Sequence, residues 1–560
     1  MLNRRQFLSR SGAAAAIAAT SAPHFAQSAE ALNARAGNRP RRIIHVVSDG
    51  MSLGTLSCAD QYSRIFRKRP LAWMEFFKRA DAQRGLMNTR SLNSLVTDSA
   101  AASSSWGSGS RVMNGALNVL PDGRELKPLY TVFADAGWTR ALVTTAEITH
   151  ATPAGFAASV VNRENPNTIA TQYLERRVDI LLGGGHPFFD KAKRKDKRDV
   201  KGEYRKAGYT VVETRDQLLA AERKGRLLGL FADSHLPYTI DQQADEKLRA
   251  KVPTLAEMTR AALDRLAASD QFILQVEGAR IDHAAHNSDA PAAIHDQIAV
   301  DEALELVLAF QREHPDTLVV ATTDHGNSNM GLNGISGDYR RSSLRFTNVN
   351  HVRCSYPEIL KKLEKAGRKF EYEPPRLIEA EEPLPYKLPS FKNPDQILAE
   401  EAKKKELPKP KTAPAKKTPH YAWRVAPADI IEVVRVATGY RMPRARALML
   451  GEVLAGESWT LFDQMNPVIT QFGQLMANYL GIGFTGNTHT SDYVPILAVG
   501  PGAERFAGLI ENTDVFKHYT ELAGIRFANP SLPLLAGDGW EADEVEQIAR
   551  YAEPFADSLA

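Results

Sequence analysis

Cysteine is scarce in this sequence, with only Cys58 and Cys354 among 560 residues. So few thiols exclude a disulfide framework and a thiolate metal cluster. We expect both to be free and packed, although one bridge between them stays open. An excess of one charge is also lacking, because the formal net charge is only +4. We therefore expect no nucleic-acid binding, and no internal repeat is evident.

The apolar run near the N-terminus, residues 12–19, is alanine-rich and too short for a stable membrane span. It follows a twin-arginine pattern at Arg4 and Arg5, and small residues suited to cleavage come after it. We interpret residues 1–29 as a twin-arginine signal peptide. This interpretation implies a bacterial protein that the twin-arginine machinery exports in the folded state, to the periplasm or beyond. The alternative is a chance Arg-Arg pair before a disordered tail.

Short runs of β-branched and other apolar residues predict strands, and helical patterns lie between them. The predicted strands are 43–47, 140–144, 178–182, 272–276, 317–321 and 495–499. The predicted helices include 253–268, 292–312, 429–438, 444–454, 466–480 and 513–522. Continuous rather than alternating apolar runs suit a parallel sheet that is covered on both faces. We predict an α/β fold with a doubly wound, mostly parallel sheet.

The regular alternation of strands and helices weakens after residue 325 and returns near residue 485. We therefore predict a catalytic core formed by residues 40–325 and 485–560, with an insertion at 326–484. Within it, residues 369–419 are rich in Pro, Glu and Lys, which is typical of a solvated connector. The insertion is expected to crown the mouth of the site or to serve a subunit interface.

The stretch from Leu95 to Ala102 places Thr97-Asp98-Ser99 before a run of small residues. If a helix begins near Ser99, its hydroxyl lies where free backbone N–H groups and the positive helix end favour an anion. Such a position suits a serine nucleophile and a phosphate oxygen. Local sequence alone also allows Asp98 or Ser99 to be merely an N-cap.

Acidic residues follow three of the predicted strands, and ligands in an α/β sheet bind beyond the carboxyl ends of strands. These residues are Asp49, Glu277 and the pair Asp324-His325. An acidic residue in one turn is unremarkable, but three at strand ends favour a metal site.

Two further segments supply imidazole. Asp282 and His286 are one helical turn apart and can chelate one ion, and His489 precedes the last predicted strand. Mixed oxygen and imidazole ligands without cysteine are typical of a catalytic zinc site. The alternative for the Asp282 segment is a salt-bridged helix start with surface histidines.

Another polar group follows the predicted strand at 140–144. It contains His150 and Thr152, and Arg163 comes after it as a candidate clamp for phosphate, because guanidinium binds phosphate in a bidentate manner. The glycines at 183–185 have neither dinucleotide nor Walker spacing, so we predict a tight turn there.

Six motifs together resemble those of the alkaline phosphatases, in the same order along the chain. They are Asp49-Gly50-Met51-Ser52, Thr97-Asp98-Ser99-Ala100-Ala101, Ala151-Thr152-Pro153-Ala154, Glu277-Gly278-Ala279-x-Ile281-Asp282, Thr323-Asp324-His325 and Thr488-His489-Thr490. The resemblance spans roughly residues 40–325 and 485–525.

The resemblance implies a role for each matched residue. Ser99 would be the nucleophile that forms a phosphoserine, and Arg163 would clamp the phosphate. One Zn²⁺ would be held by Asp282, His286 and His489, and a second by Asp49, Asp324 and His325. Asp49 would also bridge to a third ion, typically Mg²⁺, held with Thr152 and Glu277.

Two positions depart from the enterobacterial pattern. His150 replaces an Asp near the third site, so Zn²⁺ or Co²⁺ becomes an alternative to Mg²⁺ there, because imidazole favours them. His283 replaces a Lys and is expected to contact phosphate directly or through water.

The sequence thus predicts an alkaline phosphatase that hydrolyses phosphate monoesters, and a homodimer is expected from the resemblance only. One alternative is a phosphodiesterase or sulfatase of the same superfamily. Residues 97–103 lack the Pro and Arg of the sulfatase motif, and Thr152, Glu277 and Arg163 argue against a diesterase. The other alternative is an exported phosphate- or metal-binding protein without catalysis.

Overall fold

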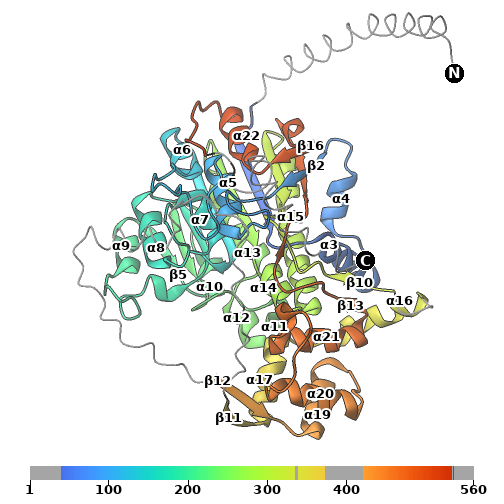
Figure 1. Ribbon diagram of the computed structural model, residues 1–560. Coiled ribbons are helices and arrows are strands. Elements are labelled where there is room, and N and C mark those ends of the chain that lie inside the picture. The colour runs from blue at the N-terminus through green and yellow to red at the C-terminus, as the bar shows by residue number, and fades with distance from the viewer. Residues whose placement is uncertain (1–38, 335–338, 373–419, 533, 535–560) are drawn as a thin grey trace, which may run out of the picture.

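A ten-stranded sheet forms the centre of the computed structural model, which describes residues 39–334, 339–372, 420–532 and 534. The strand order is β16-β2-β15-β8-β1-β7-β3-β4-β6-β5 (Figure 1). Its strands are β1 (Arg42–Ser48), β2 (Gln83–Asn88), β3 (Thr139–Glu147), β4 (Ile180–Gly184), β5 (Tyr209–Val212), β6 (Arg226–Leu230), β7 (Phe272–Gly278), β8 (Thr317–Thr322), β15 (Val494–Val499) and β16 (Gly508–Glu511). The predicted signal peptide and most of the predicted connector lie outside the described residues.

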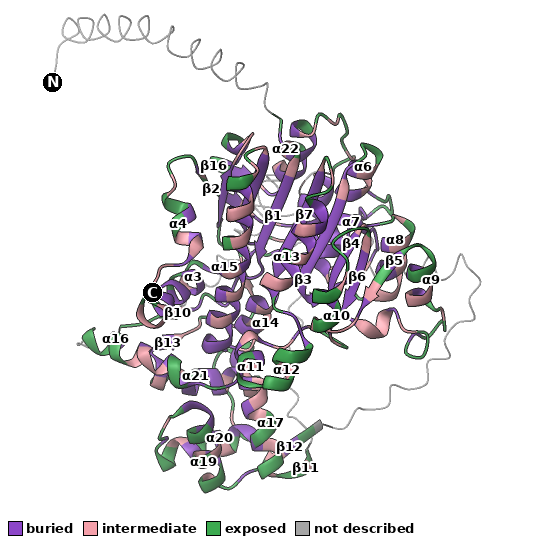
Figure 2. Ribbon diagram, turned by 180° about the vertical axis from the view of Figure 1, so that it is seen from behind, coloured by how far each residue is buried: buried purple, intermediate pink, exposed green. Residues whose placement is uncertain are grey.

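The central strands run parallel, with β1 between β7 and β8. Every residue of β7 and β8 is buried, as Figure 2 shows for the middle of the sheet. Alternate residues of β1 serve two different cores: Ile44 and Val46 belong to one, and Ile43 and Val47 to the other. The prediction of a doubly wound, mostly parallel sheet is confirmed.

Helices cover both faces of this sheet. One core includes residues of α3 (Leu53–Tyr62), α4 (Ala72–Lys78), α10 (Arg215–Ala220), α11 (Thr239–Ala244), α13 (Leu255–Leu266), α14 (Arg280–His286) and α15 (Ala290–Glu313). The other includes residues of α5 (Ser99–Ser108), α6 (Leu129–Asp135), α7 (Ala151–Ala157), α8 (Pro166–Glu175), α9 (Val200–Lys206) and α22 (Asp514–Leu522). Cys58 and Cys354 are both buried and free, as expected. No helix in the described ranges is long and apolar enough to cross a bilayer.

Four strands of the sheet are absent from the sequence prediction, namely β2, β5, β6 and β16. β5 and β16 are the outermost strands, and exposed residues alternate with less exposed ones in β2. The patterns of these three strands are therefore weaker than the continuous runs of the centre. β6 lies inside the sheet with four of its five residues buried, and this reason does not apply to it. β15 was predicted, but it runs antiparallel to β2 and β8, so one side of the sheet is mixed.

The predicted tight turn at 183–185 is wrong for its first two residues, which belong to β4. Only Gly185 has positive φ, at 87°. A Cβ on Gly184 would lie 1.9 Å from the carbonyl oxygen of Ser234. Close backbone approach, rather than turn geometry, therefore requires glycine in this strand.

The chain leaves the sheet after β8 and returns at β15. The short strands β9 (Gly326–Asn327) and β14 (His489–Thr490) pair antiparallel and bring the two ends of this excursion together. Between them lie β10 (Gly331–Leu332), α16 (Arg340–Phe346), α17 (Tyr356–Ala366), β11 (Arg368–Tyr372), β12 (His420–Arg424), α19 (Pro427–Thr438), α20 (Arg444–Leu454), α21 (Val468–Leu480) and β13 (Ile482–Gly483). In Figure 1, α17, α19 and α20 lie at the end of the molecule opposite α22. The domain boundaries themselves stay a prediction.

Candidate metal centre and active site

The carboxyl ends of β1, β7 and β8 carry the acidic residues predicted from the sequence. The ladder pairs Val47 of β1 with both Glu277 and Thr322, so the three strands end at the same level. Asp49, Glu277 and Asp324 are all buried there. Parallel register therefore gathers carboxylates that are far apart in the chain.

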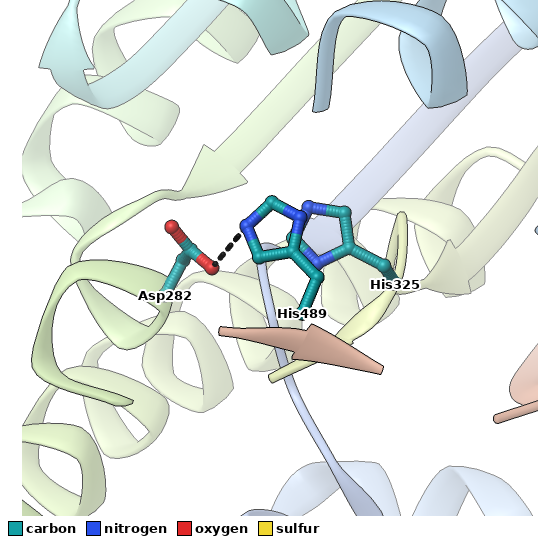
Figure 3. A group of neighbouring side chains, drawn as sticks. All are labelled: Asp282, His325 and His489. Atoms are coloured by element: carbon teal, nitrogen blue, oxygen red, sulfur yellow. Dashed lines mark ion pairs between the residues drawn. The ribbon is translucent and has the colours of Figure 1, made fainter. Parts of the chain in front are cut away.

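A first group joins Asp282 and His286 of α14 to His489 of β14. His286 Nε2 lies 3.4 Å from Asp282 Oδ2 and 3.1 Å from His489 Nε2. His489 Nε2 lies 3.5 Å from Asp282 Oδ1, which is the dashed contact in Figure 3. The His325 ring stacks on His489 with centroids 3.6 Å apart, so this group adjoins the next one.

Asp49 connects a second group to a third. In the second group, His325 Nε2 lies 3.1 Å from Asp324 Oδ2 and 3.8 Å from Asp49 Oδ1. In the third, Asp49, His150 and Glu277 each offer a ligand atom, all within 4.8 Å of one another. Thr152 in α7 lies close to Glu277, where it opposes the rise that burial causes in the pKa of that carboxyl.

Three histidines of the first two groups have the same orientation. Nδ1 faces a backbone carbonyl oxygen in each: that of Asn487 for His286 at 2.6 Å, of Thr97 for His489 at 2.8 Å, and of Gly326 for His325 at 3.3 Å. A carbonyl can only accept, so the proton resides on Nδ1. Nε2 is then left with its lone pair, as metal-binding histidines require.

Several buried oxygen atoms of the site have no hydrogen-bond partner within the described protein. They are both carboxylate oxygens of Asp49, Oε1 of Glu277, Oδ2 of Asp324 and Oγ1 of Thr152. Buried unpaired carboxylate oxygens are costly unless a cation satisfies them. The oxygen and imidazole donors, without thiolates, fit divalent metal ions.

The pKa values of the site carboxyls also favour bound cations. Burial raises the pKa of Asp49 well above its usual value, and the carboxylates of Asp324, Asp282 and Glu277 act in the same direction. Burial also raises the pKa of Glu277 to about 7. Cations are needed to hold these carboxyls ionised together, which is how metal binding couples to proton release.

Ser99 is the first residue of α5, and Asp98 is its N-cap. Asp98 Oδ1 accepts the backbone N–H of Ala101 at 2.9 Å. The Ser99 hydroxyl is therefore not needed as a cap, and its Oγ lies 3.2 Å from Nε2 of His325. A buried hydroxyl at a helix N-terminus, beside the imidazole of a candidate metal group, lies where an anion is stabilised.

Arg163 is held by the same aspartate. Arg163 Nη1 donates to Asp98 Oδ2 at 3.1 Å, and that oxygen also accepts the backbone N–H of Gly115. Arg163 Nη2 donates to Nε2 of His150 at 3.0 Å. His150 lies 5.6 Å from His283 between ring centroids, so the arginine and both histidines form one row.

The structure thus brings together every site residue predicted from the sequence. They are Asp49, Ser99, His150, Thr152, Arg163, Glu277, Asp282, His283, His286, Asp324, His325 and His489.

Sequence reasoning missed the residues that orient this set. Besides Asp98, Thr144 donates to Glu277 Oε2 at 2.5 Å, and Asn327 donates to Asp282 Oδ1 at 2.6 Å. Thr144 ends a predicted strand and Asn327 follows His325 closely. Polar residues near strand ends are the signal that could have found them.

A buried donor set of carboxylates and imidazoles around a serine, at the carboxyl edge of an α/β sheet, defines an α/β metalloenzyme. Residues 40–361 match the family model described as alkaline phosphatase. The chain is 28% identical to alkaline phosphatase 3 of Bacillus subtilis over 500 residues, covering 88% of this chain and 91% of that protein. It is 35% identical to the repressible alkaline phosphatase of Saccharomyces cerevisiae over 320 residues, covering 52% of this chain and 55% of that one.

The fold is similar to a solved structure as well. The alkaline phosphatase of Thermus thermophilus superimposes with a TM-score of 0.72 at 32% identity, covering 89% of this chain and 94% of that one. The chain belongs to the alkaline phosphatase family. It is a metal-dependent phosphoric monoester hydrolase.

Proposed function

We propose that Ser99 is the nucleophile of this alkaline phosphatase and that the reaction passes through a phosphoserine. Ser99 Oγ displaces the alcohol from phosphorus, and the departing oxygen takes up a proton. Water then displaces Ser99 Oγ from the same phosphorus, loses a proton and releases inorganic phosphate. The observation that carries this proposal is the position of Ser99 Oγ at a helix N-terminus, 3.2 Å from His325 Nε2.

The proposed ligand sets follow the three groups of side chains. Asp282, His286 and His489 hold one Zn²⁺, Asp49, Asp324 and His325 hold a second, and Asp49, Thr152 and Glu277 hold a third ion. Metal ions bound there make the serine and water more acidic and stabilise charge on the leaving oxygen. We assign the third ion as Mg²⁺. The nearness of His150 to Asp49 and Glu277 makes Zn²⁺ or Co²⁺ the alternatives.

The phosphate is bound by the row of cationic and imidazole groups beside Ser99. Arg163 donates to its non-bridging oxygens, and Asp98 holds the guanidinium in place. Arg280 Nη1 donates to Nδ1 of His283 at 2.7 Å, so that ring carries its proton on Nε2 and offers an N–H to the phosphate. The first turn of α5 adds free backbone N–H groups.

The test is the Ser99→Ala variant, measured with 4-nitrophenyl phosphate in fully metallated protein. We expect turnover to fall by about 10⁴-fold or more, as when other covalent nucleophiles are removed, while metal content by elemental analysis is unchanged. Ser105→Ala is the matched control, because Ser105 Oγ in the same helix bonds only the carbonyl of Ala101. Normal turnover by Ser99→Ala would refute the assignment. A diester analogue assayed in parallel tests the diesterase alternative.

The third metal site is tested separately, by metal stoichiometry. Glu277→Ala should bind one metal equivalent fewer than the wild type and retain the two zinc ions. Wild-type protein that binds no third equivalent would contradict the third site.

We also propose that the protein is exported by the twin-arginine machinery and assembles as a homodimer. Arg4 and Arg5 within the pattern at residues 3–8 support export, and the dimer rests on family resemblance. Replacing both arginines by lysine should retain the protein in the cytoplasm, and light scattering measures its mass in solution.

A further inference from the structure

A pocket of about 580 Å³ opens beside the metal centre. Its walls include Tyr238, Arg280, His283, His286 and Lys361. His286 also belongs to the group formed with Asp282 and His489. Of the ions in the proposed function, we assign the Zn²⁺ held by this group to the oxygen that leaves with the alcohol. The pocket therefore begins where the alcohol part of a substrate has to lie.

Arg280 is held in a fixed orientation in this pocket. Nη1 donates to Nδ1 of His283, and the guanidinium carbon lies 3.7 Å from the centroid of the Tyr238 ring. The Tyr238 hydroxyl is itself fixed, because Asn287 Nδ2 donates to it at 3.1 Å. A guanidinium that stacks on a tyrosine presents its remaining N–H groups along its edge.

The charge of Arg280 has no carboxylate in ion-pair contact among the described residues. Its Nε is buried and has no hydrogen-bond partner in the described part of the chain. A buried N–H donor without an acceptor costs free energy. Arg280 thus lines the pocket with a fixed guanidinium whose charge no described carboxylate pairs.

The two acidic residues of the pocket are already engaged by other groups. Asp241 accepts hydrogen bonds from the backbone N–H and the hydroxyl of Ser355, at 2.8 and 2.7 Å. Glu358 accepts from Nζ of Lys361 at 2.6 Å. Burial raises the pKa of Asp241, and Arg280 opposes this rise only through space, because the two are not in contact as an ion pair. The cation that stays available is Arg280.

The remaining walls set the kind of molecule that fits. Leu236, Pro237 and Leu248 are apolar, and the Tyr238 ring adds a flat face. Ser355, Pro357 and Lys361 come from α17 and the residue before it, so the excursion after β8 supplies one side. A small organic body bearing an acceptor for Arg280 matches this combination.

We propose that this pocket, which we call the Arg280 pocket, binds the alcohol part of the substrate and that Arg280 selects alcohols carrying a second anionic group. A carboxylate and a second phosphate present the same acceptor chemistry to a guanidinium. The ester then lies along one row of side chains, from its reacting phosphate to its distal anion. The row consists of Arg163, His150, His283 and Arg280. The inference rests on the proposed function, because it places the leaving oxygen beside His286.

The experiment compares two substrates of nearly equal shape in the metallated full-length enzyme. 4-Carboxyphenyl phosphate carries the distal anion, and 4-carbamoylphenyl phosphate replaces it by a neutral amide. The readout is the ratio of their kcat/KM values, in the wild type and in variants. When this ratio in a variant is compared with the ratio in the wild type, the difference in intrinsic reactivity of the two phenyl phosphates cancels.

In Arg280→Gln the ratio should fall by about tenfold, since a hydrogen bond between charged groups is worth roughly 1.5–3 kcal/mol. The change should appear mainly in KM, because the contact is remote from phosphorus. Arg280→Lys keeps the charge without the planar fork and should give an intermediate ratio. Lys361→Gln is the matched control and should change the ratio by less than about twofold, as its charge is engaged by Glu358.

The inference would be overturned if the ratio were unchanged in Arg280→Gln. It would also be overturned if the ratio fell in Lys361→Gln instead. The wild type gives an independent test, because its ratio should decrease as salt screens the distal charge. A salt-independent ratio would also overturn it. 1,4-Phenylene bisphosphate distinguishes a second phosphate from a carboxylate. Failure of the proposed function would give a different result, because Ser99→Ala would then still hydrolyse both esters.

Discussion

Two arginines that lie near the same phosphate position are held in opposite ways. Arg163 is bonded to the carboxylate of Asp98, which also caps α5. Arg280 stacks on Tyr238 and bonds a neutral ring nitrogen, and no carboxylate of the described residues is in ion-pair contact with it. A carboxylate fixes an arginine and balances its charge, whereas an aromatic face fixes it and leaves the charge available.

The two arginines also lie in different parts of the fold. Arg163 belongs to the metal centre, which is built from strand ends and helix starts of the sheet core. Arg280 belongs to a pocket whose far side comes from α17, outside that core. We infer that the metal centre performs the chemistry common to all phosphate monoesters, and that the Arg280 pocket distinguishes among them.

Among the changes that bear on this comparison, the largest effect is expected at the metal centre. Asp49→Ala removes a carboxylate shared by two ligand groups. It should lower kcat/KM for every ester by about 10³-fold or more, in line with the loss of charge stabilisation at a catalytic centre. Elemental analysis should show loss of bound metal. Asp270→Ala, at an exposed aspartate paired with Arg41, is the control and should retain both activity and metal.

A smaller loss is expected when the support of Arg163 is removed. Asp98→Asn keeps an oxygen for the helix cap but loses the charge that holds the guanidinium. We expect kcat/KM to fall by about 10–100-fold, the range for a charge-assisted bond. Affinity for inorganic phosphate, measured as product inhibition, should fall in parallel. Equal phosphate affinity in variant and wild type would contradict the role given to Asp98.

The two arginines themselves provide the sharpest comparison. Arg163→Gln should lower kcat/KM for 4-carboxyphenyl and 4-carbamoylphenyl phosphate by the same factor, about tenfold or more. Arg280→Gln should change the ratio between them. If Arg163→Gln also changed the ratio, the division between common chemistry and selection would be incorrect.

The smallest effect concerns the ring under Arg280. Tyr238→Leu removes the cation–π contact and should lower the ratio for the same two esters by about two- to fivefold, from roughly 0.5–1 kcal/mol. Tyr421→Leu removes a similar contact with Lys369, on a strand of the excursion, and should leave the ratio unchanged. Equal effects of both changes would assign the loss to general destabilisation.

The sequence predicted those parts of the fold whose side chains are apolar on both faces. The central strands and the helices of 10 or more residues at α13, α15 and α20 were found close to their observed bounds. β2, β5 and β16 were missed, because these partly exposed strands carry weak patterns, and β6 was missed although four of its five residues are buried. The strand predicted at 178–182 begins two residues later, at Ile180.

For the site, the sequence was informative where residue type determines chemistry. Three features could be recognised from the sequence alone: carboxylates at strand ends, a helical Asp-His pair and a serine before small residues. The contacts that orient them could not, since Asp98 and Arg163 are 65 residues apart and His489 meets Asp282 only through the β9–β14 pairing. Such contacts depend on register and packing.

By itself, then, the sequence determined which chemical groups this protein has and which strands are buried, because side-chain type and hydrophobic pattern are local properties. Tertiary structure alone decided that Asp98 both caps α5 and binds Arg163, and that the excursion closes at His489. It also left Arg280 without a carboxylate in ion-pair contact in the part of the chain that the structure describes. Whether a charge is balanced depends on which distant side chains approach it, and only the folded chain specifies that.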